Sequence, residues 1–344
     1  MAVHYVVTDL GTLPGGTSSD ASGINDWGHV VGSSQVAGGN SHAFLWTPTK
    51  GMQDLGTLPG GSLSGASGIS VCGLVAGMSS LAGGGTNTHA LVWSGAGGMQ
   101  DLGTLPGDGG SGAVGINACG QVVGDSYPSP GGGLHAFIWS VGVGMVGLGV
   151  LPGFTNSAAH AINNLGQVIG YCAPPSGVDR AFVWSSAAGM QPLRPLPGGL
   201  GSAAVGINDL AEIVGGSDLG NVDKPHAVLW NRAGAPQDLG VLPGGSHSTA
   251  LAINVFGTVV GNSDCAGSMS HAFVWSANEG MRDLNALIPP APGLELQGAA
   301  AINVAGQIVA AGTLHGTQHA YLLTPLREDV TDPCPAPPTR LTVR

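Results

Sequence analysis

The chain has 344 residues, of which only 8% are charged, whereas 62 are glycine and 23 are proline. Nine basic and twenty acidic residues give a net charge of -11 without any basic cluster to neutralise a row of phosphates, which argues against nucleic acid as a partner. The 43% hydrophobic content argues against disorder, and Gly, Pro, Ser or Asn interrupts every apolar stretch before the roughly 20 residues that a membrane span needs.

The chain opens on MAVHYVVTDL, which lacks the basic start and apolar core of a secretory signal. From His4 it continues as HYVVTDLGTLPGG, and the motif that ends this segment returns as DLGTLPGG at Asp54 and Asp101 and as DLGVLPGG at Asp238. Degenerate copies read GLGVLPG, PLRPLPGG and DLNALIP. A motif that recurs at a fixed spacing indicates a repeat architecture.

Two further motifs recur between the copies of the first. The pattern A-x-[GA]-I-[NS] occurs seven times, starting at Ala21, Ala66, Ala113, Ala159, Ala204, Ala250 and Ala299. The pattern H-A-x-x-W also has seven copies, the fourth with arginine and the last reading HAYLL, starting at His42, His89, His135, Arg180, His226, His271 and His319. Successive copies of this second pattern start 45 to 48 residues apart.

Each period predicts four short strands, because runs rich in Val, Ile, Leu and Trp alternate with turn residues. In the copy from Ala66 these strands read GASGIS, LVAGMS, THALVWS and MQDLGTL. N-x-x-G turns such as Asn25 to Gly28 join the first two strands, since Asn and Gly tolerate the positive φ of a tight hairpin. Four antiparallel strands in about 46 residues are typical of one propeller blade. The predicted fold class is therefore all-β, a seven-bladed β-propeller.

The two ends of the chain complement each other. The last repeat stops after HAYLLTP without a fourth strand, and the N-terminal segment is a fourth strand without the other three. We expect the strand from Val6 to Leu13 to complete the last blade and close the ring, which removes exposed sheet edges. Residues 1–325 then form one propeller domain, followed by a Pro-rich tail at 326–344. The small residues of A-x-[GA]-I-N are expected on the innermost strands, where space is short.

The motifs HAFLW, DLGTLPGG and GINxxGxVVG, in this order, resemble the HAF repeat family, and the resemblance covers residues 3–325. It implies a bacterial, often extracellular, repeat protein and transfers no catalytic residue. The fourth and fifth repeats depart from the family pattern, because Arg180 replaces the motif histidine and Pro192 and Arg194 interrupt the DLG motif.

Histidine is the commonest metal ligand in proteins, but we expect the repeated histidines to be scaffold. Packed sheets lie about 10 Å apart, so histidines of neighbouring blades cannot share an ion whose ligands lie roughly 2 Å away. Each should instead bond a loop backbone or the carboxylate of its own repeat, as His42 with Asp54. Five cysteines form no C-x-x-C pair, and no strong metal or nucleotide motif occurs. Oxygens of Asp218, Asn221 and Asp223 suit calcium, but the remainder of an EF-hand loop is missing.

A functional site is expected where the repeats differ. The loops that follow the fourth strand and those that join the second and third strands share one face of the ring and vary most. His160 stands out on this face, because other copies have Ser67, Val114, Val205 or Ala300 at its place on the innermost strand. The sequence leaves a purely structural role for His160 open as well.

Two functions fit the variable face. In the first, the protein is a binding module for a small molecule, glycan or protein, with ligand-binding residues Asp20, Tyr127, His247 and Asp264. In the second, the same face is the active site of a lyase, hydrolase or cyclase, with acid, base or anion-stabilising residues His160, Tyr171, Arg180 and Asp125. In either case we expect a monomer without a membrane span.

Overall fold

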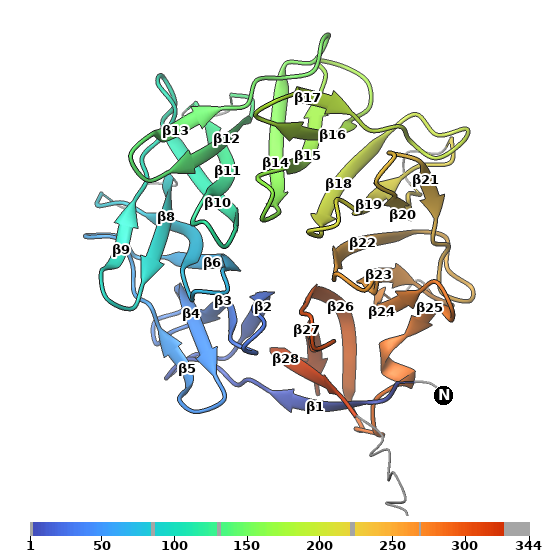
Figure 1. The fold of residues 1–344 in the computed structure, drawn as a ribbon. Helices are drawn as coiled ribbons and strands as arrows, with labels where there is room; N and C mark the ends of the chain where they lie inside the picture. Colours follow the sequence, from blue (N-terminus) through green and yellow to red (C-terminus); the bar gives the residue numbers. More distant parts are fainter. Residues whose placement is uncertain (1–2, 84–86, 129–131, 221–223, 268–269, 327–344) are drawn as a thin grey trace, which may run out of the picture.

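The computed structural model describes residues 3–83, 87–128, 132–220, 224–267 and 270–326. Seven four-stranded antiparallel sheets are arranged in a ring around a central axis (Figure 1). The seven-bladed β-propeller predicted from the repeats is therefore confirmed. Among the described residues the only helix is the three-residue 3-10 helix η1 (Leu284–Ala286), and no helix is long and apolar enough to cross a membrane.

Each blade has four strands, which follow one another from the axis to the outside of the ring. The innermost strands are β2 (Ser19–Ile24), β6 (Ser64–Ile69), β10 (Gly110–Ile116), β14 (Asn156–Ile162), β18 (Ser202–Ile207), β22 (Ser248–Ile253) and β26 (Leu294–Ile302). The second strands are β3 (Val30–Gln35), β7 (Val75–Ser80), β11 (Val122–Tyr127), β15 (Val168–Ala173), β19 (Ile213–Ser217), β23 (Val259–Asp264) and β27 (Ile308–Leu314). The third strands are β4 (Ser41–Thr47), β8 (Thr88–Ser94), β12 (His135–Ser140), β16 (Arg180–Ser185), β20 (His226–Trp230), β24 (Ser270–Ser276) and β28 (Thr317–Pro325). The outermost strands are β5 (Gly51–Asp54), β9 (Gly98–Asp101), β13 (Gly144–Gly147), β17 (Gly189–Pro192), β21 (Pro236–Asp238), β25 (Gly280–Asp283) and β1 (Tyr5–Asp9).

The outermost strands are shorter than the sequence predicted, because each ends at the first residue of the DLG motif or of its degenerate copy. In β9 the strand stops at Asp101, whose Oδ1 accepts a hydrogen bond from Gly103 N at 2.8 Å. Gly103 has a φ of 72°, a left-handed conformation that breaks an extended chain and favours glycine. The strand expected from Val6 to Leu13 is present but was predicted too long for the same reason, because β1 (Tyr5–Asp9) ends at Asp9.

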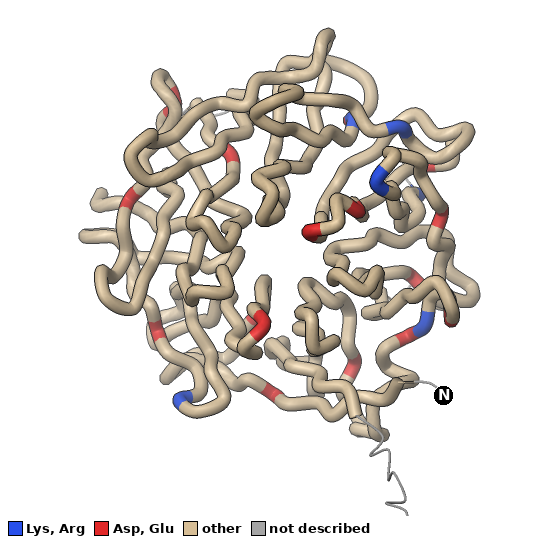
Figure 2. The backbone as a smooth tube through the Cα atoms, viewed as in Figure 1, with Lys and Arg blue, Asp and Glu red and all other residues tan. Residues whose placement is uncertain are grey.

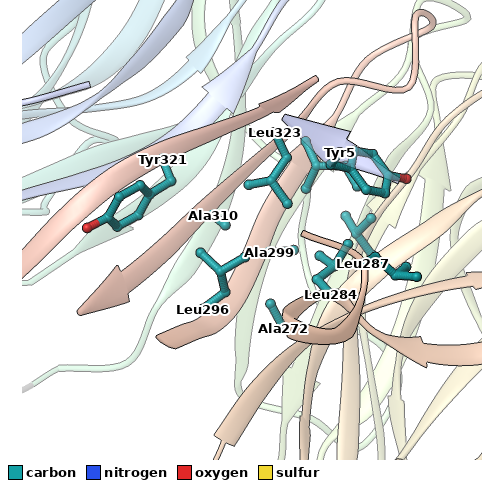
Figure 3. Close-up of a cluster of buried hydrophobic side chains, with 11 residues drawn as sticks. Tyr5, Ala272, Leu284, Leu287, Leu296, Ala299, Ala310, Tyr321 and Leu323 are labelled. Carbon is teal, nitrogen blue, oxygen red and sulfur yellow. The ribbon is translucent and has the colours of Figure 1, made fainter. Parts of the chain in front are cut away.

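The ring closes through β1, as predicted from the chain ends. This strand pairs antiparallel with β28, with Val7 opposite Leu323, so residues from both ends of the chain share the last blade. Behind the pair lies a buried cluster in which Tyr5 and Leu323 pack with Leu284 and Leu287 of the neighbouring segment (Figure 3). Burial of such side chains stabilises the closed ring by about 1.5 to 3 kcal/mol each.

A ring of asparagines connects the blades at the end of the axis where the first two strands of each blade meet. The Nδ2 atom of Asn117 donates to Asn163 O in the next blade at 3.1 Å, and Asn303 closes the ring by donating to Asn25 O at 3.1 Å. The same bond is made by Asn25, Asn163, Asn208 and Asn254. Ser70 occupies this position in the second blade, so the side-chain link from it to the third blade is missing.

Candidate functional site

A cavity of about 590 Å³, here called the axial channel, is lined mainly by the innermost strands β2, β14, β18, β22 and β26. Each of these strands has a β-bulge after the motif alanine; in β14 the register shifts between Ala159 and Ala161. His160 is the bulged residue, and its side chain lines the channel together with Ser22, Val205 and others. The bulge explains how a residue in the middle of a strand can point into the channel.

His160 is held by a hydrogen bond to the next blade. Its Nδ1 atom lies 2.8 Å from Ala204 O, and because a carbonyl oxygen can only accept, Nδ1 carries the proton. Burial lowers the pKa of His160, an effect that the bond to Ala204 partly opposes. The imidazole is therefore neutral near pH 7, with the lone pair on Nε2. Its ring centroid lies 5.4 Å from that of Tyr171 on β15.

The side chain of Asp125, on β11, extends toward the segment of β14 that carries His160. Its Oδ1 accepts a hydrogen bond from Ala159 N at 2.8 Å, so the carboxyl group lies against the residue that precedes His160. Burial raises the pKa of Asp125 to about 7, although the bond from Ala159 opposes the shift. Near neutral pH this group exchanges a proton readily, as a general acid or base must.

Two acidic residues influence Tyr171. Burial raises the pKa of the Tyr171 hydroxyl, and the carboxylates of Asp179 and Asp125 raise it further. Burial also raises the pKa of Asp179, which lies in the loop between β15 and β16. The structure thus brings His160, Tyr171 and Asp125 together, with Asp179 beside them.

A cavity of about 430 Å³ opens next to the channel and shares Val205 with it. Its wall combines Asp179 and Asp218 with apolar side chains such as Val178 and Pro225. It lies among β18, β19, the start of β22 and the loops that enter β16 and β20, which is the face predicted to carry the variable loops. Concave, mixed apolar and polar walls of this size are typical of small-molecule sites.

Glycine makes room for this cavity at Gly216 of β19. The equivalent position of the second strand carries Ser33, Met78, Asp125, Tyr171, Asn262 and Ala311 in the other blades. A Cβ atom at Gly216 would meet only ordinary contacts, with Pro225 Cβ at 3.6 Å and Thr249 Oγ1 at 3.8 Å. The space is therefore a consequence of the missing side chain.

Several residues predicted for the site lie elsewhere or hold loops. Arg180 donates from Nη2 to Leu200 O at 3.0 Å and does not line the cavity or the channel. The Tyr127 hydroxyl bonds Thr88 Oγ1 at 3.0 Å, between the second and third blades. Asp20, in contrast, does line the channel, and burial raises its pKa despite a bond from Ala21.

Asp264 and His247 form a loop anchor. Asp264 is buried and accepts hydrogen bonds from Ser246 N at 2.6 Å and His247 N at 2.8 Å, and the His247 ring lies 3.0 Å from its other oxygen. Burial opposes ionisation, but these bonds together lower the pKa of Asp264. The geometry gives this pair a structural role in the loop that enters the sixth blade.

The sequence missed the residues that form the cavity wall, among them Val178, Gly216, Pro225 and Thr249. The one available signal was Gly216, because a glycine replaces a side chain at a position that varies among the repeats. Pro225 and Thr249 look like ordinary loop and strand residues until the blades are packed.

The repeated histidines make the contacts expected of scaffold. His42 Nδ1 lies 2.9 Å from Asp54 Oδ2, and the same pair occurs in the blades that have DLG. In the third blade Gly147 replaces the aspartate, and His135 bonds Asp108 of a loop instead, at 3.0 Å. Among the described residues no group of three or more His, Cys, Asp or Glu side chains is arranged to hold a metal ion.

The proposed calcium ligands are only partly described. The carboxylate of Asp218 accepts hydrogen bonds from Leu200 N at 2.9 Å, from Gly220 N at 2.8 Å and from Gly201 N. Its oxygens are thus engaged in holding the loop between β17 and β18. Asn221 and Asp223 lie outside the described residues.

No family model matches the chain, and no curated protein matches it. The resemblance to the HAF repeat family therefore stays a prediction. Among solved structures, the chain is similar to virginiamycin B lyase from Staphylococcus aureus, with 12% identity and a TM-score of 0.56 over 94% of this chain and 99% of that chain. A catalytically inactive histidine-to-alanine variant of that lyase with quinupristin is also similar, with 13% identity and a TM-score of 0.53 over 93% and 99% of the two chains.

The chain is also similar to propellers that are parts of larger chains. A prolyl endopeptidase shares 10% identity with a TM-score of 0.60, over 91% of this chain and 51% of that chain. Acylaminoacyl peptidase from Pyrococcus horikoshii shares 11% identity with a TM-score of 0.55, over 90% and 52%. At such identities the likeness shows the propeller fold alone, because this fold carries many unrelated functions.

Proposed function

We propose that the protein is a binding module that takes a small organic molecule in the cavity between the axial channel and the loops of the fourth to sixth blades. The observation that carries this proposal is the space left by Gly216, which joins a mixed apolar and polar wall to the channel at Val205. A rigid ring that presents such a preformed cavity needs little reorganisation on binding, which favours affinity.

A substitution that fills the cavity tests the site. Gly216→Met places in β19 the side chain that β7 already carries at the equivalent position, Met78, so the fold should tolerate it. Compounds that bind the parent protein are first found by ligand-observed NMR and then titrated against the variant. We expect affinity to fall at least about tenfold, the effect of losing roughly 1.4 kcal/mol of contact.

Asn262→Met is the matched control, because Asn262 occupies the same position in the sixth blade and does not line the cavity. This variant should bind with unchanged affinity. Equal affinities of the parent and Gly216→Met for every compound found would reject the cavity as the binding site.

An enzyme that uses acid and base catalysis is a second candidate, and the pair of His160 and Asp125 favours it. His160 offers a bare Nε2 to the channel, while the Asp125 carboxyl has a pKa of about 7. Burial raises the pKa of Asp125 and lowers that of His160, so near neutral pH the carboxyl group can hold a proton while the imidazole is free to accept one, which suits acid and base roles. A compound that binds and is also converted would test this, since His160→Gln should abolish turnover and leave the dissociation constant within about twofold.

A further inference from the structure

Positive side chains are absent from the walls of the axial site. Neither the channel nor the cavity is lined by Lys or Arg, whereas Asp20, Asp179 and Asp218 line them. Figure 2 shows that Lys and Arg lie on the outer parts of the ring. Low-dielectric walls that carry one sign of charge focus the field on a ligand of opposite sign.

The carboxylates at this site have no positive partner among the described residues. All ion pairs among the described residues join a histidine to an acidic residue or Arg282 to Glu279. None of these ion pairs includes Asp20, Asp125 or Asp179. Arg180 follows Asp179 in the chain, but its guanidinium donates to Leu200 O. Asp20 and Asp179 are exposed to solvent and Asp125 is partly buried, so the charges of Asp20 and Asp179 are open to a cation that enters the site.

We propose that the cavity selects an organic cation, a protonated amine carried on an apolar body, as its ligand. This inference rests on the proposed binding function and adds the charge of the ligand to it. Asp179 would face the ammonium group, and Val178, Val205 and Pro225 would contact the apolar body. Burial keeps His160 neutral near pH 7, so the imidazole does not repel a cation.

An organic cation fits the wall better than a metal ion does. The oxygens of Asp218 are engaged by three backbone N–H groups, and the described residues contain no cluster of three carboxylate, imidazole or thiolate groups in metal-ligand geometry. A metal ion needs several such ligands at once. A cavity of about 430 Å³ with apolar side chains instead suits a compact organic body.

Three probes of nearly equal shape test the charge of the ligand. Tryptamine is cationic near pH 7, tryptophol is neutral and indole-3-propionate is anionic. In titrations followed by ligand-observed NMR, we expect tryptamine to bind at least about tenfold more tightly than tryptophol, and indole-3-propionate to bind weakest. The preference for tryptamine should shrink as salt is added, because salt screens charges that solvent can reach.

Substitution of the carboxylate locates the effect. Asp179→Asn should weaken tryptamine about tenfold and leave tryptophol unchanged, whereas Glu279→Gln, a change of equal charge at the outer edge of the sixth blade, should alter neither. Thermal melts of both variants check that the fold is intact.

The outcomes separate this inference from the function on which it rests. Equal binding of the three probes, or a preference for the anion, overturns the cation inference. If neutral or anionic compounds bind and Gly216→Met blocks them, the binding function stands without the cation inference. If no compound of any charge binds in a manner sensitive to Gly216→Met, both are wrong.

Discussion

At the scale of single residues, the pairs of histidine and aspartate show how the repeat maintains one local contact. Where DLG is kept, the histidine bonds the aspartate across the third and fourth strands, as His89 does with Asp101 at 2.9 Å. Where Gly147 replaces the aspartate, Asp108 takes over, and where Pro192 replaces it, Arg180 replaces the histidine and bonds a loop carbonyl. Because these pairs are partly exposed, each contributes only about 0 to 1 kcal/mol.

Asp125 should make the stability of the protein depend on pH. Burial raises the pKa of Asp125 in the folded state to about 7, so the folded protein binds more protons than the unfolded chain between about pH 4 and 7, and stability falls as pH rises through that window. Asp125→Asn removes the titration and can still accept from Ala159 N. We expect the variant to be more stable than the parent at pH 8, by at most about 4 kcal/mol, and similar near pH 4.

Urea unfolding of both proteins at pH 4, 6 and 8 measures this difference. A gap between the two that stays constant with pH would show that Asp125 has an ordinary pKa in the folded protein.

Tyr321 carries a polar atom in the core without a partner among the described residues. The side chain of Tyr321 is buried, yet its hydroxyl group makes no hydrogen bond with any described residue. Phenylalanine fills the corresponding place in Phe44, Phe137, Phe182 and Phe273, so the site accepts that ring. We expect Tyr321→Phe to raise the free energy of unfolding by about 1 kcal/mol, because it removes an unsatisfied buried group. A lower melting temperature for this variant would instead indicate a bound water at the hydroxyl.

At the scale of strands and turns, the asparagine ring has one gap, at Ser70. An asparagine there could donate to Asn117 O in the next blade, as Asn117 itself does to Asn163 O. We expect Ser70→Asn to stabilise the protein by about 0.5 to 1.5 kcal/mol, and Asn117→Ser to destabilise it by a similar or larger amount. Denaturant titrations of the two variants measure both effects, and a destabilising Ser70→Asn would mean that the second blade cannot accommodate the link.

Strands were predictable from the sequence where the repeat fixes both pattern and turn. The inner strands follow from A-x-[GA]-I-N and the N-x-x-G turn, and the β-bulges did not disturb their order. The outermost strands were predicted too long, because apolar leucines after DLG suggested a continued strand. Leu13 is buried, but it lies in the loop after β1, beyond Gly11, whose backbone has a left-handed conformation.

At the scale of the whole molecule, closure of the ring depends on β1. Removal of residues 1–10 would expose the edge of β28 and delete the buried side chains of Tyr5 and Leu10. Two such side chains contribute roughly 3 to 6 kcal/mol together. We expect the truncated protein to melt at a clearly lower temperature and to aggregate through the open edge, as measured by calorimetry and light scattering. A truncated protein that melts as the parent does would contradict the closure.

Fold and site differ in how far the sequence determines them. Seven copies of three motifs define the propeller, and His160, which departs from the pattern, lies on a bulge and lines the axial channel. The cavity was not predictable, because it arises from packing: Gly216 leaves a gap that Pro225 and Thr249 of other segments then enclose. Arg180 was predicted as a site residue because it departs from the repeat, yet its side chain donates a hydrogen bond to a loop carbonyl.

The most direct test of the central claim is a crystal structure of the protein soaked with tryptamine. We expect density in the cavity between the fourth and sixth blades, with the ammonium group within about 3 Å of Asp179 and the ring against Val205. Density only at the opposite end of the axis, against the asparagine ring, would contradict the account.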